Sequence, residues 1–127
     1  KIINKAKNEK ELNIIEDQYT STTSAYDLAS FIAHIIENNK KYNINKKNNI
    51  FHFVNNGIIT WFDFAKEIFS ASNIKVTLNR ISFNDYKFIA KRPKFSALNN
   101  NKVKNVFDYD INHYSNSLIN CLKRNYK

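Results

Sequence analysis

One glycine, Gly57, is present among the 127 residues of the chain. Loops that hold phosphates with backbone N–H groups need several glycines, because glycine adopts positive φ at little cost and lets the backbone approach a ligand closely. The chain therefore has neither a G-x-G-x-x-G fingerprint nor a P-loop. We expect no cofactor-binding residues for a dinucleotide or a nucleoside triphosphate of those kinds.

Size and composition indicate one globular domain over residues 1–127. A chain of this length buries roughly two-thirds of the surface that its unfolded form exposes, and its 43% apolar residues can supply a core. No apolar run approaches the roughly 20 residues of a membrane span, and the basic start lacks the apolar segment of a secretory leader. The lone Cys121, on the predicted apolar face of the last helix, is interpreted as a core residue. We predict a cytoplasmic protein that binds no membrane.

The net charge of +9 has two interpretations. Such a charge favours a nucleic acid or an anionic lipid surface as partner. Alternatively, it reflects a compositional bias, because the lysines are scattered, asparagine is abundant and no basic stripe follows one helix. We favour the second interpretation, and a small basic nucleic-acid-binding module remains the alternative.

Apolar spacing and capping residues predict alternating helices and strands. Ser24 and Asp27 have the spacing of a capping box, and the helical apolar pattern that follows ends at Asn38. Thr60 is placed to cap the next helix, and Ser82 to cap a single turn. The other predicted helices cover residues 1–9, 61–72, 99–107 and 112–126, and the predicted strands cover residues 11–17, 50–56 and 74–79. This alternation predicts an α/β fold with few, short strands.

The sequence offers little support for a catalytic or metal site. His34, His52 and His113 lie far apart, and no pair of cysteines is present, so we expect no metal site. Tyr42 and Lys46 have the Y-x-x-x-K spacing of a proton-transfer pair. However, they lie in the stretch KKYNINKKNN, whose asparagines favour turns over a helix. We therefore predict no catalytic residues.

The segment KRPKFSALNNNKV, residues 91–103, contains the only proline, Pro93. Proline biases the preceding residue, Arg92, to an extended backbone, so the arginine side chain has a defined direction. Its planar guanidinium suits phosphate, and a charge-assisted contact is worth roughly 1.5–3 kcal/mol. From this pattern alone, an ordinary exposed loop arginine is an equally good interpretation.

Three segments together resemble one family. They are IIEDQYTSTTSAYDLASFIAHII, IFHFVNNGIITWFDFAKEIF and KRPKFSALNNNKV, in this order and with suitable separations. They are similar to the C-terminal part of dTDP-4-dehydrorhamnose reductases, of the extended short-chain dehydrogenase/reductase superfamily, and the similarity covers nearly the whole chain. The resemblance implies the C-terminal part of a Rossmann-type sugar-nucleotide reductase, without its dinucleotide-binding half.

The resemblance also implies an activity for the complete enzyme. That enzyme would reduce dTDP-4-dehydro-L-rhamnose to dTDP-L-rhamnose with NADPH, bound to a Rossmann part that carries the glycine-rich loop and the Tyr-x-x-x-Lys pair. Tyr42 and Lys46 do not lie where the family's pair lies. This chain would be the substrate-binding portion, expected to bind a dTDP-sugar, to bind no NADPH and to be inactive alone.

Four residues carry the substrate site that the resemblance implies. Arg92 matches the arginine of the family's Arg-Pro motif and is expected to contact the diphosphate. Asp17 and Gln18 match an Asp-Gln pair beside the nucleotide pocket, and Thr23 matches a threonine that follows. Trp61 matches a tryptophan at a helix start and is interpreted as structural.

The chain departs from the family's Gly-x-Pro-Thr pattern, because Thr20 and Thr22 replace the glycine and the proline. Thr20 cannot adopt positive φ cheaply, so this loop must differ. The absence of a partner domain is expected to expose an apolar face, which favours self-association or pairing with a separately encoded Rossmann domain. A vestigial or purely structural fragment is the remaining alternative.

Overall fold

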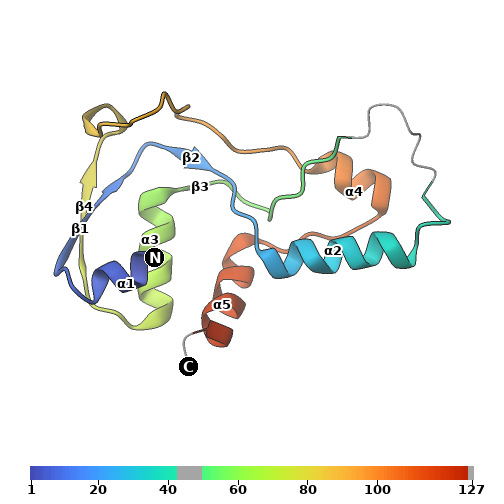
Figure 1. Cartoon of the computed structure of the whole chain (residues 1–127), viewed down its shortest axis with the longest axis horizontal. Coiled ribbons are helices and arrows are strands. Elements are labelled where there is room, and N and C mark those ends of the chain that lie inside the picture. The colour runs from blue at the N-terminus through green and yellow to red at the C-terminus, as the bar shows by residue number, and fades with distance from the viewer. Residues whose placement is uncertain (43–49, 126–127) are drawn as a thin grey trace.

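Short strands alternate with helices in the computed structural model, which describes residues 1–42 and 50–125 (Figure 1). The helices are α1 (Ile2–Ala6), α2 (Ala25–Glu37), α3 (Trp61–Ser72), α4 (Asn101–Phe107) and α5 (Tyr114–Asn125). The strands are β1 (Glu11–Ile15), β2 (Tyr19–Thr20), β3 (Ile59–Thr60) and β4 (Thr77–Ile81), and the 3-10 turn η1 (Phe83–Asp85) follows β4. The predicted α/β fold class is confirmed.

The starts of two predicted helices are capped as the sequence indicates. The Ser24 hydroxyl accepts from the backbone N–H of Asp27 at 3.3 Å at the start of α2. The Thr60 hydroxyl accepts from the backbone N–H of Asp63 at 3.1 Å at the start of α3. Each bond satisfies a donor that has no partner within the helix, so these boundaries are set locally.

Four strands form two separate pairs. β1 and β4 are parallel, with Leu12 opposite Leu78 and Ile15 opposite Ile81. β2 and β3 are antiparallel. The strand predicted at residues 74–79 corresponds to β4, which runs from Thr77 to Ile81 and so begins later than expected. Thr20, where the family has glycine, lies in β2 and has no positive φ.

The predicted strand at residues 50–56 is wrong. This stretch is extended but pairs with no strand of residues 1–42 or 50–125, and among those residues it makes one isolated bridge, from Asn56 to His113. Its backbone groups bond to loops instead, since the N–H of Asn55 donates to the Thr22 carbonyl and the Asn100 amide donates to the Val54 carbonyl. The alternation of aromatic residues therefore reflects packing against helices and not membership of a sheet.

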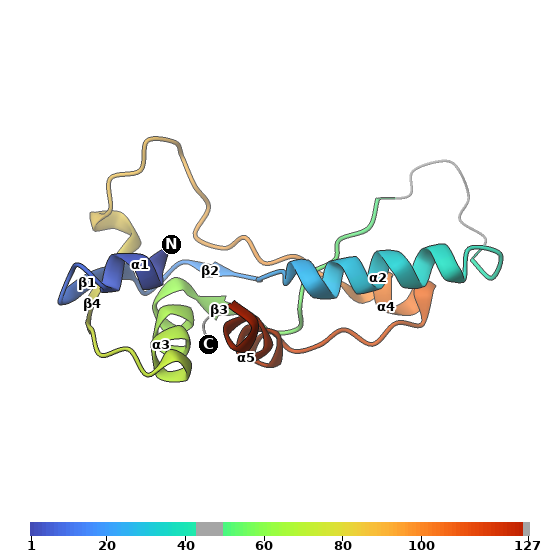
Figure 2. The ribbon, with the colours of Figure 1, turned by 60° about the horizontal axis from the view of Figure 1, so that its bottom comes forward.

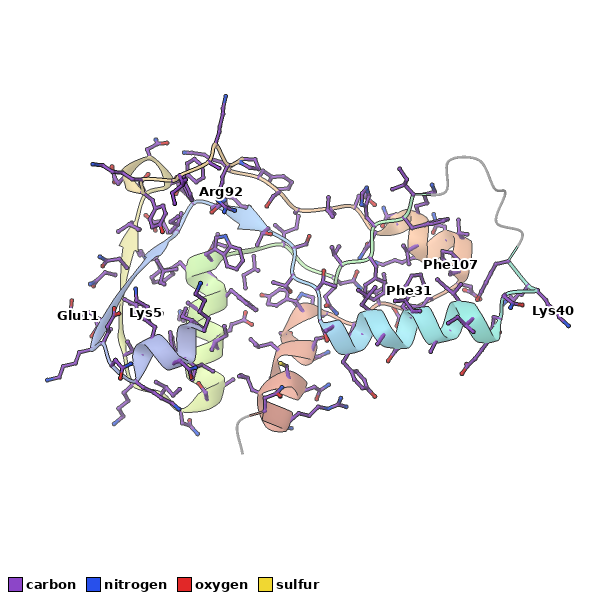
Figure 3. The ribbon with its side chains drawn as sticks, viewed as in Figure 1. Lys5, Glu11, Phe31, Lys40, Arg92 and Phe107 are labelled. Carbon is purple, nitrogen blue, oxygen red and sulfur yellow. The ribbon has the colours of Figure 1, made fainter. Side chains whose placement is uncertain are left out.

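Two apolar clusters form the core at opposite ends of the molecule (Figure 1, Figure 2). The cluster beneath α1, β1 and α3 contains the buried residues Ile3, Leu12, Ala65, Ile68, Phe69 and Leu122. The cluster between α2 and α4 contains Phe31, Tyr42, Val103, Phe107 and Ile111. Figure 3 shows Phe31 and Phe107 facing one another there, with ring centroids 5.2 Å apart. The single domain over residues 1–127 stays a prediction.

Gly57 occupies a turn that only glycine fits well. Its φ is +99°, and a Cβ added there would lie 2.6 Å from both His113 Nε2 and Tyr114 Cδ1. The one glycine of the chain therefore serves the tight turn before β3, where His113 and Tyr114 leave no room for a Cβ.

Replacing Gly57 by alanine is expected to lower the free energy of unfolding by about 2 kcal/mol, because the backbone conformation is strained for a residue with a Cβ. Urea titration followed by circular dichroism measures this change. Asn73→Gly is the matched control, since Asn73 has a left-handed φ of 55° at the end of α3, where glycine is favoured. An unchanged midpoint for Gly57→Ala would show that the turn relaxes freely.

Candidate functional site

A groove of about 1180 Å³ lies along the face of β1 and α3 and is closed on one side by the segment that follows η1. Its walls contain Lys1, Ile2, Asn13, Ile14, Ile15, Gln18, Trp61, Phe64, Ala65, Ile68, Tyr86, Lys87, Phe88, Ile89, Ala90, Arg92, Pro93 and Ser96. Among these described residues Lys1, Lys87 and Arg92 are cations, and none is an aspartate or glutamate. The groove is therefore an apolar and aromatic surface with positive charge, which suits an anion that carries rings.

Residues 17–19 hold the Arg-Pro segment in place. The Gln18 amide donates to the Pro93 carbonyl at 3.1 Å, although the two residues are 75 positions apart. The backbone N–H of Tyr19 donates to the Lys94 carbonyl at 2.8 Å, and the Ser96 N–H donates to the Tyr19 carbonyl at 2.9 Å. These bonds attach the far wall of the groove to the end of β1.

Gln18 is the buried member of this connection, with 7% of its surface exposed. A buried amide must find partners, because leaving one unpaired costs about 1–3 kcal/mol. Its Nε2 is paired with Pro93, so the backbone beside Arg92 is anchored directly. The structure thus brings Gln18 and Arg92 to the same groove.

Asp17 supports the segment from outside the groove. One carboxylate oxygen accepts from the backbone N–H of Phe83, and the other lies 3.1 Å from the Lys94 ammonium. The Phe83 N–H, and after it Lys94, hold the pKa of the Asp17 carboxyl below its ordinary value. Asp17 therefore bonds to Phe83 in η1 and to Lys94 beside Pro93, at two points of the segment that closes the groove. Its contact with a sugar nucleotide stays a prediction.

Arg92 is exposed on the groove wall. Its guanidinium lies 6.0 Å from the centroid of the Phe88 ring, and no carboxylate of residues 1–42 or 50–125 forms an ion pair with it. Figure 3 labels Arg92 on the segment that passes above β2 in that view. A guanidinium of this kind has its donors available to a ligand.

Thr23 lies apart from the other three predicted residues. It is exposed, and its hydroxyl donates to the Phe53 carbonyl over a long 3.5 Å contact. It lines a different cavity, of about 470 Å³, between the start of α2 and α5, together with Asp27 and Arg124. The structure therefore assembles Gln18 and Arg92, with Asp17 behind them, and leaves Thr23 elsewhere.

The aromatic walls of the groove were missed by the sequence analysis. Trp61, interpreted there as structural, is 43% exposed and lines the groove with Phe64, Tyr86 and Phe88. A local signal was present, because Trp61 lies outside the buried stripe of α3 that includes Phe62. An exposed tryptophan at a helix start is a signal for a ligand surface.

The other residues considered as catalytic or metal-binding candidates do not form such a site in the part of the chain that the structure describes. Residues 1–42 and 50–125 contain no group of three or more His, Cys, Asp or Glu side chains that could hold a metal ion. Cys121 is exposed, so its interpretation as a core residue is wrong: it precedes the buried Leu122 in the chain and lines the cavity of about 470 Å³ between the start of α2 and α5. Tyr42 is buried, and Lys46 lies outside the described residues. No described helix is long and apolar enough to cross a membrane.

Comparison with known families matches the whole chain. The model of the RmlD substrate binding domain matches residues 1–127. The dTDP-4-dehydrorhamnose reductase of Aggregatibacter actinomycetemcomitans is 31% identical over 123 residues, which cover 91% of this chain and 41% of that protein. The Escherichia coli K12 enzyme of the same name is 33% identical over 110 residues, which cover 80% of this chain and 36% of that protein. The chain thus spans well under half the length of these relatives.

Solved structures show the same correspondence. A dTDP-4-dehydrorhamnose reductase from Clostridium acetobutylicum superposes with a TM-score of 0.84 at 29% identity, over 97% of this chain and 41% of that one. The Bacillus anthracis enzyme, in complex with NADP, gives a TM-score of 0.81 at 27% identity, over 98% of this chain and 41% of that one.

Proposed function

Because the chain belongs to the RmlD substrate binding domain family, we propose that it binds a dTDP-deoxysugar for a dTDP-4-dehydrorhamnose reductase-like protein. The observation that carries this proposal is the groove with three cations, no carboxylate and a wall anchored by Gln18. The complete protein would reduce dTDP-4-dehydro-L-rhamnose to dTDP-L-rhamnose.

Arg92 is proposed to bind the diphosphate. Its planar guanidinium offers paired donors to phosphate oxygens, and Pro93 together with the Gln18 bond restrains its backbone before the ligand arrives. A restrained arginine loses less conformational freedom on binding. Lys87, on the same wall, adds positive charge without paired geometry.

The aromatic walls are proposed to hold the thymine base and the deoxysugar. Trp61 and Phe64 have ring centroids 6.4 Å apart on one wall, and Phe88 lies on the other. Flat aromatic faces stack well on a base, and apolar surface suits a sugar that lacks a hydroxyl group.

NADPH does not fit the groups that this chain provides. A phosphate cradle needs free backbone N–H groups at a glycine-rich turn, and the one glycine turn, at Gly57, is filled by His113 and Tyr114. NADPH supplies a hydride where it is bound, and we propose that its site lies on a separate Rossmann part. This chain would contribute binding and orientation of the sugar nucleotide, and no proton or hydride transfer.

The only tryptophan offers a direct test of sugar-nucleotide binding, since Trp61 lines the groove. Titration with dTDP-L-rhamnose is expected to change the Trp61 emission in a saturable way, and thymidine, which lacks the diphosphate, is expected to bind at least about tenfold more weakly. NADPH is expected to leave the emission unchanged once its own absorbance is corrected.

A DNA duplex is the matched competitor for this measurement. A basic nucleic-acid-binding module would bind the duplex far more tightly than dTDP-L-rhamnose, with an affinity that falls steeply as salt rises. That result would replace the proposed function with the alternative. Binding of neither ligand by a folded chain would favour a structural fragment.

A further inference from the structure

The residues that follow β4 form a loop whose two ends meet. Residues 83–94, which we call the groove loop, leave the rest of the chain at η1 and return beside β2 (Figure 2). At these ends the Lys94 ammonium lies 5.6 Å from the centroid of the Phe83 ring. Between the ends the loop supplies Phe88 and Arg92 to the wall of the groove. Surface loops with adjacent ends often carry binding residues.

The middle of the groove loop has little support of its own. Among residues 1–42 and 50–125, the backbone groups of residues 86–92 form no hydrogen bond, and Ile89 is fully exposed. A segment with few buried contacts and an unbonded backbone moves easily unless its ends are held. The position of Arg92 therefore depends on how the two ends of the loop are fixed.

Asp17 joins these two ends. One of its carboxylate oxygens accepts from the backbone N–H of Phe83, and the other lies 3.1 Å from the Lys94 ammonium. The first bond fixes the beginning of the groove loop, and the ion pair fixes its end. Asp17 itself does not line the groove, whereas the next residue, Gln18, does.

Charge argues against direct contact between Asp17 and the diphosphate, because a carboxylate and a phosphate repel one another. We propose that Asp17 is a positioning residue, which joins both ends of the groove loop and so holds Arg92 in place for the diphosphate. This indirect role, which rests on the proposed function, replaces the contact that the resemblance implies. A loop that is closed before the ligand arrives has less conformational freedom to lose on binding.

Substitution of Asp17 tests this role, because charge and positioning predict opposite results. Removal of a carboxylate near the groove would, by charge alone, strengthen binding of dTDP-L-rhamnose. We expect Asp17→Ala instead to weaken binding about tenfold in the Trp61 emission titration. Asp17→Asn keeps an acceptor for the Phe83 N–H but loses the ion pair, so it should weaken binding less.

Glu16→Ala is the matched control. Glu16 precedes Asp17 in the chain, but it pairs with Arg80 of β4 at 2.9 Å and does not line the groove. Its removal changes net charge equally and takes one ion pair from the same end of β1. We expect the affinity to stay within about threefold of the wild type.

A double variant shows whether Asp17 acts through Arg92. Once Arg92 is replaced by alanine, Asp17→Ala should cost little further affinity, so the loss in the double variant should be smaller than the product of the two single losses. Losses that multiply would indicate that Asp17 contacts the ligand independently, and the positioning role would be wrong. Binding that Asp17→Ala leaves unchanged or strengthens would contradict it equally.

NMR order parameters of the ligand-free chain give a second readout. The backbone amides of residues 86–92 should become more mobile in Asp17→Ala than in the wild type or Glu16→Ala, while those of α3 should keep the value of about 0.85 of a rigid backbone. An unchanged loop, or a loss of order in α3 as well, would overturn the positioning role. A folded wild-type chain that binds no dTDP-L-rhamnose would instead overturn the proposed function itself.

Discussion

Replacing Asp27 by alanine is expected to lower the free energy of unfolding by about 4 kcal/mol. Asp27 is 9% exposed, and its carboxylate accepts from the side chains of Asn55, Asn112 and Ser117, with the Asn112 bond at 3.3 Å. Removing it takes a charged acceptor from three donors, two of them in buried positions, and leaves the Asn55 amide only its weaker bonds to the Asn112 carbonyl and the Ser117 hydroxyl. The donors come from three segments, so their loss is not confined to α2.

The position of this network explains the size of the effect. Asp27 belongs to α2, which packs into the cluster around Phe31, whereas Ser117 belongs to α5, which carries Leu122 into the other cluster. Asp27 therefore connects the two halves of the core through hydrogen bonds. Loss of the carboxylate should weaken their association as well as the local bonds.

Urea unfolding followed by circular dichroism measures the change. Asp110→Ala is the matched control, because Asp110 is an exposed aspartate, and a change within about 0.5 kcal/mol is expected there. Asp27→Asn preserves shape but places a donor where an acceptor is needed, so it should retain only part of the stability. A loss in Asp27→Ala no larger than in Asp110→Ala would show that the donors find other partners.

Acid titration separates the charge of Asp27 from its packing. Burial raises the pKa of the Asp27 carboxyl, but the hydrogen bonds from Ser117, Asn55 and Asn112 together outweigh burial and lower it below its ordinary value. Since the pKa is lower in the folded state, the charge stabilises the fold above the unfolded pKa of about 3.9. That contribution is lost as pH falls through the folded pKa. The Asp27→Ala variant should therefore lose less stability on acidification than the wild type.

Local signals predict the helices of this fold well. Ser24 and Thr60 cap helices because their hydroxyls bond to N–H groups three residues away, and such contacts need no tertiary structure. Residues 50–56 mislead for the opposite reason. Phe51 and Phe53 have the alternation of a strand, but their side chains join the cluster between α2 and α4 from an unpaired segment. Sheet pairing depends on distant partners, which an alternating pattern does not identify.

The candidate site, too, could be predicted only in part from local sequence patterns. The Arg-Pro dipeptide marks Arg92 as a directed cation, but no local pattern indicates that the Gln18 amide bonds to the Pro93 carbonyl. The resemblance placed Thr23 with Arg92, whereas the fold puts Thr23 at a separate cavity. Trp61 was missed because a tryptophan at a helix start suits both packing and binding.

Replacing Arg92 by alanine is expected to weaken dTDP-L-rhamnose binding roughly 10- to 150-fold, which corresponds to the roughly 1.5–3 kcal/mol of a charge-assisted contact. The Trp61 emission titration measures this loss. Lys91→Ala is the matched control, because Lys91 is an exposed cation next in the chain that does not line the groove. Its removal changes net charge equally and should alter affinity by less than about threefold.

Two further variants distinguish contact from general attraction. Arg92→Lys keeps the charge but loses the planar fork, so it should recover only part of the affinity. Gln18→Ala removes the bond to Pro93 and should weaken binding indirectly, with the groove wall less restrained. Because Arg92 is exposed and pairs with no described carboxylate, Arg92→Ala should leave the urea midpoint unchanged. Equal losses for Lys91→Ala and Arg92→Ala would mean that the groove attracts the diphosphate by net charge alone, and the assignment of Arg92 as its ligand would be wrong.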